Sequence, residues 1–214
     1  MSVPPPAGPV AEILAAISCG ERLARDRAQA SAALAPDVKR RHLQEQVAQA
    51  ETERARLIEA RLGEVASVDL EGRFRPFFDA FFDRTRPSDW LEAQVWQYIG
   101  DALVRDLSDA LAPALDPVSA EVATTVLSDR DEQESLALDE IARVLEEDPG
   151  EVERLASYAR RIIGEALTQT RRALDASDAV RSLLGSEENE KRMLLDLLQR
   201  HRARLDRLGI DRVD

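Results

Sequence analysis

The stretch that decides the fold is LQEQVAQAETERARLIEARL, residues 43–62. Its apolar residues and one arginine recur at steps of three and four, which places them on one face of a helix. That face consists of Leu43, Val47, Ala50, Arg54, Leu57, Ile58 and Leu62. We expect the face to pack into a core, although Arg54 lies in its middle and Glu51 one turn before it. Two opposite charges there indicate either a solvated edge or the centre of a polar site.

The composition is typical of an acidic protein with one ordinary core. The chain has 214 residues, 44% of them hydrophobic, which suffices for a single domain. It contains no apolar run of about 18 residues, and its N-terminus lacks the features of a signal peptide, so we expect a cytoplasmic protein without a membrane span. The only cysteine, Cys19, excludes an internal disulfide framework and any multi-cysteine metal site.

The charge balance bears on possible partners. There are 41 acidic residues against 29 lysines and arginines, a net charge of −12. Nucleic-acid binding depends largely on neutralising phosphates, so this balance disfavours a nucleic-acid partner unless the arginines gather on one face.

Helical periodicity runs through most of the chain, and no strand-like alternation persists. Short turns at Pro36 and Asp116 predict two antiparallel helical hairpins, each starting a helix with an aspartate cap. We expect a disordered segment at 1–8, one domain over 9–208 and additional C-terminal helices over 149–208. The expected helices span about 9–30, 38–65, 117–147 and 186–208, and two more begin at about 88–89 and 148–151; the last helix ends at Gly209.

Between the hairpins, residues 63–87 lose a clear period and form the expected crossover. All five phenylalanines lie there, and a short helix over 77–83 is one possibility. The phenylalanines either plug the end of the bundle or form a surface for a membrane or partner. They are Phe74, Phe77, Phe78, Phe81 and Phe82.

The two hairpins repeat a pattern of acidic residues on their inner faces. The first helix of each contributes one carboxylate, and the second contributes an acid followed by a polar residue three positions later. In chain order these residues are Glu21, Glu51 with Arg54, Asp106, and Asp129 with Glu132; Asp101 fits the position of Asp106 about as well. The stripe expected on the fourth helix is Val122, Val126, Asp129, Gln133 and Leu136, with Glu132 at its edge. This layout matches the carboxylate bundles that hold two irons with one Glu from each of two helices and Glu-x-x-His from the other two.

Several short segments make the match more specific. Together they resemble the actinobacterial ferritin-like proteins, a family similar to the tRNA 2-methylthio-isopentenyladenosine hydroxylase, over roughly residues 9–208. The segments are Cys19-Gly20-Glu21-Arg22-Leu23, Ala50-Glu51-x-x-Arg54, Pro87-Ser88-Asp89-Trp90-Leu91-Glu92, Tyr98-Ile99-Gly100-Asp101 and Gly164-Glu165-Ala166-Leu167-Thr168-Gln169-Thr170. The resemblance implies an all-α, ferritin-like four-helix bundle, a non-haem di-iron centre and O₂-dependent hydroxylation of modified tRNA.

The same resemblance implies metal ligands at Glu21, Glu51, Asp106 and Asp129, completed by histidines at positions 54 and 132. This sequence has Arg54 and Glu132 there instead. Neither histidine of the chain replaces them, because His42 lies on the outward side of its helix and His201 shares an apolar stripe.

Three readings of the acidic residues follow. Arg54, which coordinates no metal, can supply the positive charge in place of the metals. Alternatively, one hard cation such as Fe²⁺, Mn²⁺ or Mg²⁺ binds a carboxylate site that includes Glu132. In the third reading the fourth helix faces elsewhere and no site forms.

We therefore expect a divergent ferritin-like protein whose metal centre is lost or altered, similar to the tRNA-modifying hydroxylases. The alternative is a non-catalytic helical scaffold with an arginine–carboxylate core. A homodimer is compatible with either, and tRNA is suggested only by the resemblance.

Overall fold

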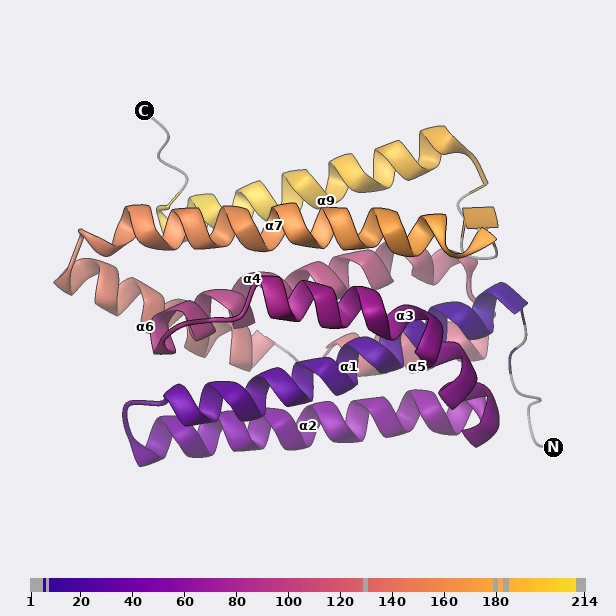
Figure 1. Cartoon of the computed structure of the whole chain (residues 1–214), viewed down its shortest axis with the longest axis horizontal. Helices are drawn as coiled ribbons and strands as arrows, with labels where there is room; N and C mark the ends of the chain where they lie inside the picture. Colours follow the sequence, from indigo (N-terminus) through magenta and orange to yellow (C-terminus); the bar gives the residue numbers. More distant parts are fainter. Residues whose placement is uncertain (1–5, 7, 129–130, 179–180, 183–184, 211–214) are drawn as a thin grey trace.

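The computed structural model is an elongated bundle whose helices run close to its long axis (Figure 1). It describes residue 6 and residues 8–128, 131–178, 181–182 and 185–210. Within these ranges the regular structure is helical and contains no strand. The all-α prediction is confirmed. The expected disordered N-terminus falls almost wholly outside the described residues. No helix in the described ranges is long and apolar enough to cross a membrane.

The first hairpin consists of α1 (Gly8–Leu34) and α2 (Val38–Leu62), which lie side by side along their lengths (Figure 1). Asp37 caps α2 as predicted, because its carboxylate accepts a hydrogen bond from the backbone N–H of Arg40 at 2.8 Å. At the far end of α2, Ile58 and Leu62 pack into one apolar cluster with Ile13 and Leu14 of α1.

Residues 63–87 do connect the two hairpins, but the prediction of an irregular segment with at most a short helix is wrong, since Glu64–Arg84 form one helix, α3, with Pro76 inside it. The phenylalanines at 74, 77, 78 and 81 follow helical spacing and form an inward stripe. This stripe stabilises a helix although the segment as a whole lacks a clear hydrophobic period. Helix α3 runs between α1 and α7 along the side of the bundle, not across its end (Figure 1). Phe74 and Phe81 are buried and the other three phenylalanines are partly buried, which favours interior packing over an exposed aromatic surface.

Helix α4 (Trp90–Leu111) is the central element and packs against α1, α6, α7 and α9. It begins with a reciprocal cap: the Glu92 backbone N–H donates to Asp89 at 2.8 Å, and the Ser88 N–H donates to the Glu92 carboxylate at 2.8 Å. A short 3₁₀ turn, Ala112–Ala114, leads to α5 (Pro117–Ser128), which is capped by Asp116 through the Ser119 N–H.

The single helix expected over 117–147 is two helices, α5 and α6 (Asp131–Glu147), with residues 129–130 outside the described part. The stripe extrapolated across this point is also wrong: Leu136 is 46% exposed, whereas Ala137 and Ile141 are buried. Residues 128–135 contain no hydrophobic side chain that would keep one helical phase.

The C-terminal part adds α7 (Glu151–Asp175) and α9 (Glu187–Leu208), which lie against α4 and against each other. Ser186 caps α9 through the Asn189 N–H, and Gly209 ends it in the left-handed conformation at φ 68°, as predicted. One apolar cluster joins α4, α6, α7 and α9 with Phe81 of α3, and a second joins α1, α2, α3 and α5 with residues of α4, α7 and α9. The predicted site residues Glu21 and Glu51 belong to neither cluster.

Candidate functional site

The charged pair of α2 lies inside the protein. Glu51 is fully buried, Arg54 is 7% exposed, and their side chains meet at 3.0 Å between Oε1 and Nη1. The predicted stripe is shifted by about one residue: Leu57 is 49% exposed, while Ala55 is buried beside Ile58. This rotation turns both charges inward. Of the two interpretations of this helix, the structure therefore supports a polar site over a solvated edge.

Helix α1 contributes a second pair of buried charged residues, Glu21 and Arg27, both 0% exposed. Arg27 Nη2 donates to the carboxylate of Asp101 on α4 at 2.8 Å. The guanidinium carbon of Arg27 also lies 4.8 Å from the ring centroid of Trp96, a cation–π contact. A small cavity of about 20 Å³ is lined by Glu21, Asp101 and Trp96 among others. Asp101, the alternative to Asp106, thus faces the same interior space as Glu21.

A hydrogen-bond network fixes the indole on which Arg27 rests. Trp96 Nε1 donates to Thr85 Oγ1 at 2.8 Å, and the Tyr158 hydroxyl donates to the Thr85 carbonyl at 2.7 Å. Burial raises the pKa of Tyr158 far above its usual value, so this hydroxyl keeps its proton as a donor. The indole also lies against Gly100, where a Cβ would be 2.8 Å from the ring. The glycine of the Tyr-Ile-Gly-Asp segment is therefore explained by close packing of Trp96.

Asp106 lies on a different side of α4 from Asp101. Five helical residues separate the two, which corresponds to about 140° of rotation. Asp106 accepts two hydrogen bonds from Arg204 of α9, at 2.6 and 3.0 Å, and Arg200 lies 3.3 Å away. Burial alone would lower the pKa of Arg204, but its bonds to Asp106 raise it above the usual value. The predicted ligand Asp106 is therefore placed against the C-terminal helix and away from the cavity of Glu21.

The position predicted for a histidine ligand is filled by Arg54, which forms an ion pair with the acid one helical turn before it. A guanidinium has donors only and cannot coordinate a metal. Within the described residues, no group of three or more Asp, Glu, His or Cys side chains is arranged to hold a metal ion. These residues do not fit a di-iron centre built on Glu-x-x-His. Asp129 and the side chain of Glu132 lie outside the described part, so their role as ligands stays a prediction.

The two histidines lie where the sequence predicts. His42 is exposed and His201 is buried in α9, which agrees with their predicted outward and core positions. Cys19 is buried, and burial, with a smaller contribution from the Glu71 carboxylate, raises its pKa to about 12. None of these three side chains lines the cavity of Glu21.

Two arginines that matter were missed from the sequence, namely Arg27 and Arg204. Each has a helical signal in hindsight: Arg27 is three residues from Ala24 and four from Ser31, and both neighbours are buried small residues. Arg204 lies at similar steps from the buried Leu197, His201 and Leu208. The sequence therefore carries the same signal for Arg27 and Arg204 as for Arg54 of α2, namely an arginine on an otherwise buried helical face.

The comparisons with known proteins agree with this architecture. Residues 7–187 match a family model described as a ferritin-like domain of actinomycetes. This range covers α1 to α7 and stops where α9 begins. None of the curated proteins compared with the chain matches it.

Proposed function

The chain belongs to the actinomycete family of ferritin-like domains, and on that premise we propose that it is a non-catalytic member in which arginines take over the role of the metal charge. Its polar interior then serves to hold the bundle in one arrangement. The protein acts through binding rather than through oxygen chemistry.

The observation that carries this proposal is the contact of Arg54 with Glu51. The arginine stands one helical turn after the acid, at the position where the family's metal site would need an imidazole. Unpaired buried carboxylates would protonate or destabilise the fold. The guanidinium of Arg54 compensates Glu51 at 3.0 Å inside the protein, and Arg27 compensates Asp101 at 2.8 Å in the same way. Glu51 and Asp101 are thus each paired with a positive charge without a metal ion.

The competing proposal keeps one hard cation on a carboxylate site, with O₂-dependent hydroxylation of modified tRNA as the activity that the family resemblance suggests. It is favoured by the complete burial of Glu21 and Glu51 on neighbouring helices. Asp129 and Glu132 would have to supply further oxygen ligands, and iron, manganese or magnesium would be the candidate ion.

Elemental analysis separates the two proposals. Protein purified from cells grown with added iron and manganese should contain well below one equivalent of either metal and stay folded in the presence of a chelator. Near-stoichiometric metal that is lost in a Glu51→Gln variant would overturn the arginine proposal and support the cation site.

A matched pair of variants tests the role of Arg54 directly. Arg54→Met should lower the free energy of unfolding by about 3–5 kcal/mol, because it leaves a buried carboxylate without its cation. The control is Arg56→Met, which removes another arginine with the same spacing to a glutamate, at 2.7 Å from Glu53, but with a side chain 65% exposed. Its effect should be below about 1 kcal/mol. Equal effects for the two variants would exclude a special role for Arg54.

A further inference from the structure

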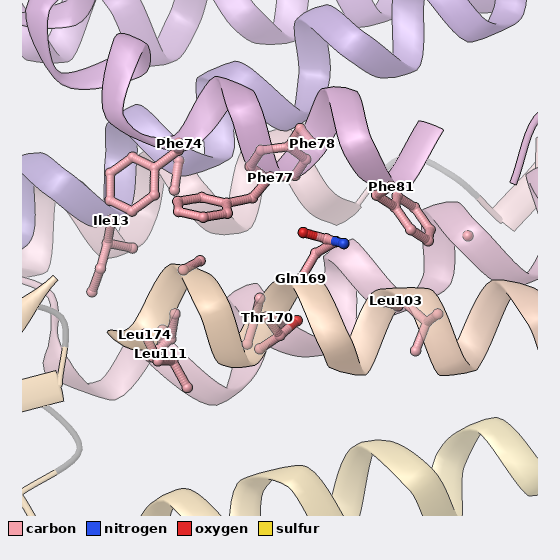
Figure 2. A pocket seen from close by; sticks show the side chains of 15 residues that line it. Ile13, Phe74, Phe77, Phe78, Phe81, Leu103, Leu111, Gln169, Thr170 and Leu174 are labelled. Atoms are coloured by element: carbon pink, nitrogen blue, oxygen red, sulfur yellow. The ribbon is translucent and has the colours of Figure 1, made fainter. Parts of the chain in front are cut away.

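A second feature of the interior is an apolar cavity of about 120 Å³ between α1, α3, α4 and α7. Figure 2 shows the phenylalanines of α3 on one side of it and Gln169 and Thr170 of α7 on the other. Among the described residues, no charged side chain lines it. Its walls are formed mainly by Phe74, Phe77, Phe78, Phe81, Leu103 and Leu107.

Gln169 is the polar group of this cavity that has a fixed orientation. Its Nε2 donates to the carboxylate of Glu165 at 3.3 Å, and Glu165 is in turn held by Arg84 at 3.2 Å. The amide oxygen consequently turns the other way, and Figure 2 shows it rising from α7 toward Phe77. Gln169 is 5% exposed, and its Oε1 accepts no hydrogen bond from any described residue. A buried acceptor without a donor costs free energy that a suitable ligand would recover.

The size and lining of the cavity restrict that ligand. An apolar cavity of about 150 Å³ in another protein holds one benzene molecule, so 120 Å³ suits a single six-membered ring. A charged ligand would lose its hydration without finding a counter-charge on these walls. Phe77, Phe78 and Thr170 are only partly buried, which leaves a side of the cavity accessible from solvent.

We propose that this cavity is a binding site for a small neutral molecule that has one apolar ring and one hydroxyl or N–H group. The ring lies among the phenylalanines of α3 and the leucines of α4. The hydroxyl or N–H donates to Gln169 Oε1. The site lies outside the arginine–carboxylate core and uses none of its residues.

Titration of the full-length protein with phenol and with toluene, followed by methyl and aromatic NMR shifts, tests the proposal. Both should give saturable shift changes confined to residues lining the cavity. Phenol is less hydrophobic than toluene and on that ground alone should bind more weakly. Because it adds one neutral hydrogen bond, its affinity should be about fivefold higher than its hydrophobicity predicts. The absence of saturable shifts at the cavity for both compounds would overturn the proposal.

Two variants separate the roles of the amide and the cavity. Gln169→Leu should remove the preference for phenol and leave toluene binding intact, whereas an unchanged preference would show that the amide does not select the ligand. Ala173→Leu fills the cavity from α7 and should abolish binding of both compounds. Thr168→Val, at an exposed position of the same helix, is the control and should bind both compounds as the wild type does. Binding by Ala173→Leu at wild-type strength would place the ligand elsewhere and refute the site.

Discussion

Replacing Arg204 with methionine tests a buried charge pair that joins the C-terminal helix α9 to α4. Arg204 forms two hydrogen bonds, at 2.6 and 3.0 Å, with an Asp106 side chain that is 2% exposed. Removing one partner of a buried pair costs about 3–5 kcal/mol, because the other charge stays buried. Arg200 remains 3.3 Å from the same carboxylate and offsets part of the loss. We therefore expect a decrease near the lower end, about 3 kcal/mol.

The assay is equilibrium unfolding of the intact chain in urea, with thermal unfolding as a second measure. With a urea dependence of about 3 kcal/mol per molar, the midpoint should fall by about 1 M. In a chain of this size the same change corresponds to a decrease in Tm of about 6–12 °C. Arg200→Met is the matched control, since it contacts the same carboxylate from one turn away but is 57% exposed. Its effect should stay below about 1 kcal/mol.

A double variant distinguishes charge from packing. Asp106→Leu together with Arg204→Met removes both charges, so the free energy of unfolding should return to within about 1–2 kcal/mol of the wild type. The reasoning is refuted if Arg204→Met behaves like Arg200→Met, or if the double variant is less stable than Arg204→Met alone.

Two further predictions concern Cys19 and Gly100. The raised pKa of Cys19, about 12 against 9.0, means that its stability contribution is complete below pH 9 and is lost as the pH rises toward 12. We therefore compare the free energies of unfolding in urea of the wild type and Cys19→Ala. Between pH 9 and 10.5 their difference should change by up to about 1.4 kcal/mol per pH unit to the disadvantage of the wild type; a constant difference would contradict this. Gly100→Ala should destabilise the protein by about 1–3 kcal/mol, because its Cβ would lie 2.8 Å from the Trp96 ring. The control Gly164→Ala, whose Cβ would have nothing within 4 Å, should stabilise the protein by about 0.5–1 kcal/mol. Opposite signs in thermal unfolding would confirm the packing role of Gly100, and equal signs would exclude it.

The sequence predicted those parts of the fold that depend on local signals. The caps at Asp37 and Asp116 and the terminal Gly209 are all found, since each satisfies backbone groups within a few residues. The irregular structure expected for the crossover is wrong because the phenylalanine stripe of α3 is stabilised by packing against α1 and α7, and these long-range contacts are not visible in the local sequence. The prediction of the inward face of the fourth helix is wrong for a related reason. The charged segment after Val126 has no apolar residues that mark which face is buried, so the inward positions of Ala137 and Ile141 could not be extrapolated from Val126.

The site shows the same limit in the pairing of its charges. Glu51 and Arg54 are three residues apart on one helix, so their contact follows from spacing alone. Arg27 and Asp101 are 74 residues apart, and Arg204 and Asp106 are 98 apart, so these pairs depend on how α1 and α9 pack against α4. The repeat of acidic residues is visible in the sequence. The arginine that pairs with an acid can be predicted from the sequence only for Glu51 and Arg54, which lie on the same helix.

The directions of these pairs bear on what the bundle can do. A metal centre requires carboxylates from several helices to converge on one point, with their oxygens available to the ion. In the described part of this protein each of three acids is instead directed to an arginine on its own side: Glu51 along α2, Asp101 toward α1 and Asp106 toward α9. Recruiting Asp106 to the interior would require breaking a bidentate contact and turning the carboxylate about 140° around α4. Because Glu51, Asp101 and Asp106 are each paired with an arginine, we favour a structural role for the polar core and look for binding in the apolar cavity beside it.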